Sequence, residues 1–265
     1  MWLGLFLVGP LCLMLAISFR GYQAGVGILP TWEVGHYARF LGDPFYRGIL
    51  WNTLALGLQV TVWSLVLGYP LAYALSGLRG VRRSLLYFAI LLPLLTSAVV
   101  RTFGWMILLS NNGFINQSLQ ALGLTDAPVR MMYHMSGVVI ALVEVLLPFM
   151  VLAIDAALLN VDPALGEAAR NLGAGSIRTF LAVTLPLSVP GVLSGSVLVF
   201  TLAISAFVTP SLIGGPKIKV MPTLVYEQGV SLLNWPFGAA IAFVMLFVIL
   251  ALFTATFRVT NRGAA

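Results

Sequence analysis

Charged residues are scarce in this sequence: they make up 8% of the chain, whereas hydrophobic residues make up 60%. Soluble domains carry about 25% charged residues, so these charges are too few to cover a water-soluble globule of 265 residues. A mean hydropathy of +1.02 agrees with this conclusion. The composition argues against a soluble protein with an unusually large core, and it predicts that lipid surrounds most of the surface.

Residues that carry catalytic or metal chemistry are also few. The single Cys12 excludes an intramolecular disulfide and a cysteine cluster for metal, and the isolated His36 and His134 are expected to be structural or surface residues. The sequence has neither a GxxxxGK[ST] phosphate loop nor a Gly-x-Ser-x-Gly elbow. We therefore expect no metal site, no cofactor and no enzymatic activity in this chain.

The net charge of +6 does not point to nucleic acid, because the basic residues are dispersed between apolar segments without a dense Lys/Arg run. Such dispersed charges are typical of those that orient a membrane protein. We therefore expect these charges to orient the chain in a membrane and not to bind nucleic acid.

Six hydrophobic segments are long enough to cross a membrane by the rule of about 20 residues per span. They are Trp2–Phe19, Ile49–Leu75, Leu85–Leu109, Met135–Leu158, Pro186–Ile213 and Phe237–Phe257. Their continuous length differs from the alternating segments of about 10 residues in membrane barrels. We predict an all-α polytopic membrane protein, in which the first run is a retained helix because it lacks a basic leader and a cleavage site. Pro93, Pro148, Pro186 and Pro190 are read as kinks or hinges.

Arginines in the short links predict the orientation of the chain. They are Arg79, Arg82 and Arg83 after the second segment, Arg170 and Arg178 after the fourth, and Arg258 and Arg262 in the tail. Charges in short loops near span ends weigh most, so these links and both termini are predicted to be cytoplasmic. The opposite connections, around Gly21–Arg47, Asn111–His134 and Gly214–Pro236, are expected to form ordered short helices and turns outside.

The link after the fourth segment contains a predicted short helix. Asp162-Pro163 is typical of a helix start, and Gly173 is a natural stop. A helical repeat places four apolar residues on one face: Leu165, Ala168, Ala169 and Leu172. Ser176 is predicted to cap a second short helix. The small apolar face suits a groove on another protein. The alternative is a helix resting on the membrane surface, although such helices prefer larger apolar residues.

Arg101 and Glu144 lie in the middle of predicted spans, where a charge costs at least a few kcal/mol. They either pair and pin the third and fourth spans together, or line a translocation path, or snorkel towards the interface. Trp105, four residues after Arg101, is either a cation-binding surface or part of the interfacial belt. These three residues are the translocation-path candidates. Asp155 lies near the end of its span, where it is either exposed or buried.

The string Glu167-Ala168-Ala169, followed by Gly173, Ile177 and Leu185-Pro186, resembles the EAA signature of ABC importer permeases. The resemblance extends over most of the chain. "NTLALGLQVTVWSLVLGYPLAYALSG" is similar to the start of the family's core domain, and "LLPLLTSAVVRTFGWMILL", "LLPFMVLAIDAAL", "LVFTLAISAFVTPSLIGGP" and "NWPFGAAI" resemble the spermidine/putrescine branch. The chain departs from the family at Met1, which stands almost inside the first span and indicates a trimmed sequence or an alternative start.

The resemblance implies a type I importer with two permeases, here a heterodimer, two ATPase subunits that bind ATP and Mg, and an extracytoplasmic solute-binding protein. It implies that Glu167, Ala168, Ala169, Leu172 and Gly173 contact the ATPase, within a coupling loop at 160–185. It also implies a first helix and outer connection at 1–48, a core permease domain at 49–258 and a short cytoplasmic tail at 259–265.

The expected function is therefore a permease subunit in a bacterial inner membrane, moving a polyamine or a related small charged solute. A stand-alone channel or secondary carrier is the alternative, although repeated halves with broken helices are usual there and none is visible. A non-transport scaffold is the third reading, but it gives no reason for Arg101, Trp105 and Glu144 to lie at mid-span.

Overall fold

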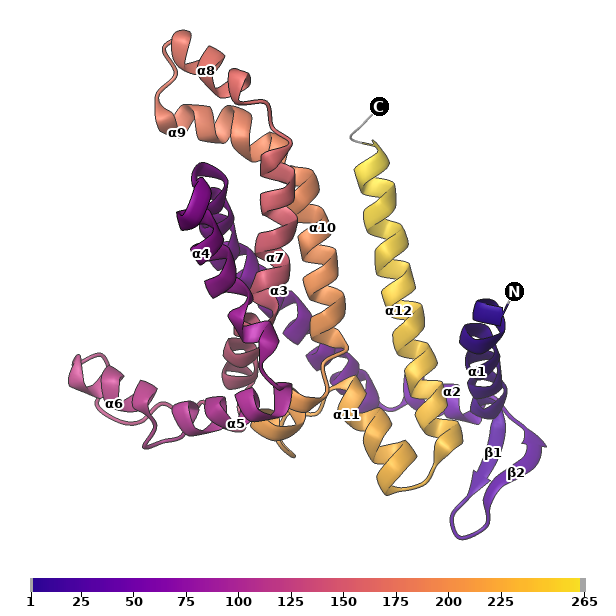
Figure 1. Ribbon diagram of the computed structural model, residues 1–265. Coiled ribbons are helices and arrows are strands. Elements are labelled where there is room, and N and C mark those ends of the chain that lie inside the picture. The colour runs from indigo at the N-terminus through magenta and orange to yellow at the C-terminus, as the bar shows by residue number, and fades with distance from the viewer. Residues whose placement is uncertain (1, 263–265) are drawn as a thin grey trace.

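The computed structural model describes residues 2–262, which form an elongated bundle of helices with one β-hairpin (Figure 1). Three long helices pack together at its centre: α3 (Pro44–Gly77), α7 (Met135–Leu159) and α10 (Leu185–Ile204). At one edge, α1 (Trp2–Ser18) lies beside α12 (Trp235–Arg262). The predicted all-α membrane fold is confirmed in its class.

Small residues allow the central helices to approach closely. A Cβ atom at Gly191 of α10 would lie 2.7 Å from the carbonyl oxygen of Ala153 in α7, and one at Gly195 would lie 2.9 Å from the Met150 sulfur. Such contacts are typical of membrane helices, where close van der Waals packing replaces the hydrophobic effect between segments. The buried core accordingly runs along the seam between α3, α7 and α10.

The sequence predicts one continuous span at Leu85–Leu109, but in the structure this third hydrophobic segment is broken. It forms α4 (Gly80–Leu91), a 3-10 turn η1 (Leu92–Leu95) and α5 (Ala98–Leu109). The stretch Gly80–Leu95 meets the stretch Ala98–Ala121 at a bend of 96°. Pro93 lacks a backbone N–H, and Thr96 is extended at φ −98° and ψ 148°, so the helical hydrogen bonds stop here. The kink expected at Pro93 is thus a full break.

The fifth segment also has different bounds. Instead of Pro186–Ile213, a continuous helical stretch runs from Ser176 to Ile204 through α9 (Ser176–Thr179), a π turn η2 (Phe180–Thr184) and α10. Beyond Ile204 the chain breaks and forms a second π turn, η3 (Pro210–Gly214).

Among the described residues, four helices are long and apolar enough to span a membrane, or five when the bent pair counts as one span. The 17 residues of α1 give a length of about 25 Å, which is less than the roughly 30 Å of a bilayer core. Six spans remain a prediction.

The connecting elements gather at two ends of the bundle (Figure 1). One end holds α8 (Pro163–Asn171), α9 and the beginning of α4. The other holds the hairpin, α5, α6 (Phe114–Ala121) and α11 (Met221–Tyr226), which leads into a third π turn, η4 (Glu227–Ser231). The hairpin pairs β1 (Arg20–Gln23) with β2 (Gly27–Trp32) and is followed by α2 (Gly35–Gly42). Short helices and turns had been expected there. Gly25 and Gly27, at φ +84° and +100°, allow the chain to reverse tightly into paired strands.

Candidate functional site

The short helix α8 is built by its own local sequence. The Ala164 N–H donates to Asp162 Oδ1 over 2.9 Å, and Pro163 occupies the first turn. At the other end Gly173 has φ +82°, and the Ala174 N–H donates to the Ala169 carbonyl over 3.0 Å. The predicted start and stop are confirmed. The predicted Ser176 cap is wrong, because Ser176 is already the first residue of α9.

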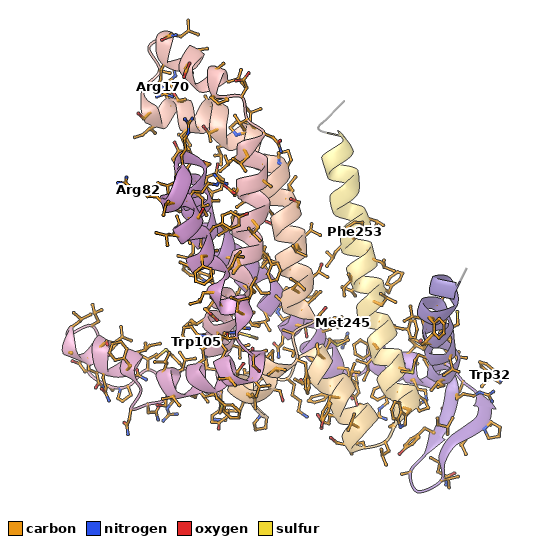
Figure 2. All side chains as sticks on the ribbon, in the orientation of Figure 1. Trp32, Arg82, Trp105, Arg170, Met245 and Phe253 are labelled. Atoms are coloured by element: carbon orange, nitrogen blue, oxygen red, sulfur yellow. The ribbon has the colours of Figure 1, made fainter. Side chains whose placement is uncertain are left out.

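Most of the apolar face of α8 is exposed within the part of the chain that the structure describes. Leu172 is 89% exposed and Leu165 is 47% exposed, while Glu167 and Ala168 are exposed and Ala169 is half-buried. Figure 2 shows Arg170 of α8 at the same end of the molecule as Arg82 of α4. The face is therefore available to another molecule at the end where the arginine-rich links meet.

Behind α8, aromatic contacts tie this end to the central helices. The ring of Phe180 in η2 packs edge-on against Tyr69 and Tyr73 of α3, with centroids 5.7 and 5.3 Å apart. The Tyr69 hydroxyl hydrogen-bonds Ser188 of α10 over 2.8 Å. These contacts join η2, which follows α9, to α3, and α3 to α10.

The structure brings the three translocation-path candidates together. Arg101 Nε of α5 lies 3.6 Å from Glu144 Oε2 of α7, and Trp105 Nε1 donates to the same oxygen over 3.3 Å. Figure 2 labels Trp105 in this region, where α5 meets α7. The Arg101 side chain is 12% exposed and also donates to the Pro93 carbonyl. These contacts agree with the pairing alternative. Whether the cluster lines a path stays a prediction.

A second charged pair was not foreseen from the sequence. Asp155 of α7 is 1% exposed, and its Oδ2 accepts a 2.7 Å hydrogen bond from Arg83 Nη2 of α4. Arg83 also donates to the Leu75 carbonyl at the end of α3 over 2.9 Å. The buried alternative for Asp155 is therefore correct. The sequence feature that could have predicted the pair is Arg83, but the sequence analysis interprets Arg83 only as a charge that orients the chain.

The histidines have local structural contacts. His36 Nε2 hydrogen-bonds the Arg20 carbonyl over 2.9 Å, and His134 Nδ1 accepts from the Ser136 N–H at the start of α7. Within residues 2–262, no three His, Cys, Asp or Glu side chains lie close enough together to hold a metal ion. The histidines are therefore not candidates for a functional site. The candidate functional regions are the exposed face of α8 and the Arg101–Trp105–Glu144 cluster.

Comparison with known proteins identifies the class to which this architecture belongs. Residues 5–262 match the family described as "Binding-protein-dependent transport system inner membrane component". The chain belongs to this family. It is a multi-pass inner-membrane permease subunit of a binding-protein-dependent ABC importer, and this assignment favours the importer over the channel, carrier and scaffold alternatives.

Individual relatives agree with the assignment. The permease is 36% identical over 247 residues to the spermidine/putrescine transport system permease protein PotB of Salmonella typhimurium strain SL1344, covering 93% of this chain and 86% of that protein. It is 33% identical to PotB of Haemophilus influenzae, covering 98% and 91%. A bacterial alginate ABC transporter, crystallised with a pentasaccharide-bound periplasmic protein, shares the fold. Its TM-score is 0.81 at 19% identity, over 98% of this chain and 90% of that one.

Proposed function

We propose that this permease forms part of the membrane path of a polyamine importer, with spermidine or putrescine as the solute. The observation that carries the proposal is the 36% identity to PotB across 93% of this chain. In this proposal a second, non-identical permease completes the path, and an extracytoplasmic binding protein delivers the solute. The cluster of Arg101, Trp105 and Glu144 supports a path for a charged solute, because it places charged groups where α5 meets the apolar central helix α7.

We further propose that α8 is the element through which ATP hydrolysis drives transport. Two ATPase subunits would bind ATP and Mg and receive α8 in a surface groove, contacting Glu167, Ala168, Ala169, Leu172 and Gly173. The exposure of this face supports the proposal, as does the connection from α9 through Phe180 to α3. It requires α8 to be cytoplasmic, as the link arginines predict. The same arginines predict that both termini are cytoplasmic.

Uptake of labelled amines tests the proposed function. The permease is expressed in a polyamine-uptake-deficient bacterium together with the ATPase, second permease and binding protein of the same importer. Uptake of spermidine or putrescine is measured against cells that lack only this permease. We expect permease-dependent and ATP-dependent uptake that unlabelled polyamine suppresses.

Amino-acid-like solutes, phosphonates and ferric iron serve as competitors in the same assay, and direct binding of each to the purified binding protein is measured. If one of these solutes is taken up and neither polyamine is, the polyamine proposal is wrong. The importer function then stands with a different solute.

A further inference from the structure

The carboxylate of Glu144 is held loosely. Both of its contacts go to Oε2, at 3.3 Å from Trp105 Nε1 and 3.6 Å from Arg101 Nε, and the second exceeds a normal hydrogen-bond length. Within the described chain, Oε1 accepts no hydrogen bond, and 30% of the side chain is exposed. The Arg83–Asp155 pair, by contrast, has a 2.7 Å hydrogen bond and an Asp155 side chain only 2% exposed. Glu144 therefore retains capacity for a better donor.

Arg101 is engaged by a different partner. Its Nη1 donates to the Pro93 carbonyl and lies 3.5 Å from Thr96 Oγ1, both at the break between α4 and α5. Its Nε is buried and makes no hydrogen bond within the described residues. The guanidinium thus shares the Pro93 carbonyl with Thr96, whose N–H and hydroxyl also donate to it, and it neutralises Glu144 only by proximity. It can keep its contact with Pro93 while Glu144 accepts another cation.

We propose that Glu144 is a transient acceptor for an alkylammonium group of the solute during passage, and that Arg101 neutralises it between passages. The proposal rests on the polyamine function and assigns the residue that recognises the solute's charge. An ammonium donor can form a shorter bond to Oε1 than Arg101 forms to Oε2, because a charged donor and acceptor prefer about 2.7–2.9 Å.

The neighbouring Trp105 indole favours the same occupant, because aromatic rings attract organic cations. Passage also needs the solute to be released from this site. The loose Arg101 contact provides a competing cation that can reoccupy the carboxylate when the solute leaves.

The first experiment compares Glu144→Gln with the matched control Glu33→Gln in the complete importer, reconstituted with its ATPase, second permease and binding protein. Glu33 lies just after β2, and its side chain is 47% exposed. We expect the rate of spermidine uptake to fall roughly tenfold or more in Glu144→Gln, as for loss of a charge-assisted hydrogen bond, and to be unchanged in Glu33→Gln. Hydrolysis stimulated by the loaded binding protein should persist in both.

A purely structural ion pair predicts a different pattern, which the double variant Arg101→Gln/Glu144→Gln distinguishes. If the pair only pins α5 to α7, removing both charges restores thermal stability and uptake together. We expect stability to recover and uptake to remain low. Recovery of uptake in the double variant would overturn the proposal.

A binding readout separates solute contact from packing. Spermidine added to the purified importer, without binding protein, should change the tryptophan fluorescence of the wild type. The change should be lost in Trp105→Phe and shifted to higher spermidine concentration in Glu144→Gln. Wild-type uptake and an unshifted titration in Glu144→Gln would overturn the role of Glu144 alone. Absence of amine uptake by the wild-type importer would overturn the polyamine function, and the inference with it.

Discussion

Removing one charge from the Arg83–Asp155 pair should strongly destabilise the permease. Asp155 is 1% exposed, and its Oδ1 already lacks a hydrogen-bond partner, so Arg83→Met would leave a buried carboxylate with no donor. Losing one partner of a buried ion pair costs about 3–5 kcal/mol. The lost bond from Arg83 to the Leu75 carbonyl, over 2.9 Å, adds about 1 kcal/mol. Asp155→Asn keeps that second bond and should therefore destabilise less than Arg83→Met.

The assay is thermal unfolding of the purified permease in detergent, together with the yield of folded protein from membranes. The double variant Arg83→Met/Asp155→Asn should cost much less than the sum of the single changes, because no uncompensated charge remains. Lys219→Met is the matched control. Its 2.6 Å pair with Glu227 has side chains 31% and 40% exposed, so solvent screening limits the expected cost to about 0–1 kcal/mol. If Arg83→Met unfolds like Lys219→Met, the argument from burial is refuted.

Three further predictions address other parts of the molecule. Ala169→Trp should obstruct docking of α8, and Gly173→Val should strain the helix stop at φ +82° by about 1–2 kcal/mol. In both variants uptake and stimulated hydrolysis should fall while membrane insertion persists; unchanged hydrolysis and ATPase association would contradict the coupling role. Gly191→Val should separate α10 from α7, because even a Cβ at this position would lie 2.7 Å from the Ala153 carbonyl oxygen. The melting temperature should therefore fall, and an unchanged melting temperature would refute the packing argument. Thr53→Val removes the acceptor of the Met221 N–H, a 2.8 Å bond, and should cost about 1–3 kcal/mol by thermal unfolding; a cost below about 0.5 kcal/mol would show that this N–H finds another acceptor.

The features that sequence could predict are those with local causes. The start of α8 at Asp162 and its stop at Gly173 depend on neighbouring residues, so their patterns were sufficient. The pairing of Arg101 with Glu144 was predictable as one of the alternatives because of the cost of an isolated charge in lipid. Choosing between pairing and snorkelling required coordinates.

The break in the third segment could not be predicted from proline alone. Pro70, Pro148 and Pro190 lie inside α3, α7 and α10, and all three helices continue past them. At Pro93 the helix stops instead, and the Pro93 carbonyl accepts from Thr96 and from Arg101 of the following helix. The difference depends on where the chain packs afterwards, and no local pattern records that.

The partner of Asp155 was missed for a similar reason. Arg83 is 72 residues away in sequence, and the two meet only because α4 lies against α7. Its position in a short arginine-rich link favoured an orienting role. The hairpin at β1 and β2 was missed because glycine in a connection indicates a reversal without specifying strands on either side.

The π turn at Phe180–Thr184 has a consequence for how the helix from Ser176 to Ile204 tolerates changes in length. A π turn bonds each residue five positions along and so accommodates one residue more than the α-helix around it. Deleting one residue between Phe180 and Thr184 would let this stretch become regular α-helix while leaving both flanks in their present orientation. Deleting one residue within α10 would instead turn everything on one side by about 100° relative to the other. The π turn is thus the position where this helical stretch can lose a residue without changing the side-chain alignment of the membrane part relative to the α8 end.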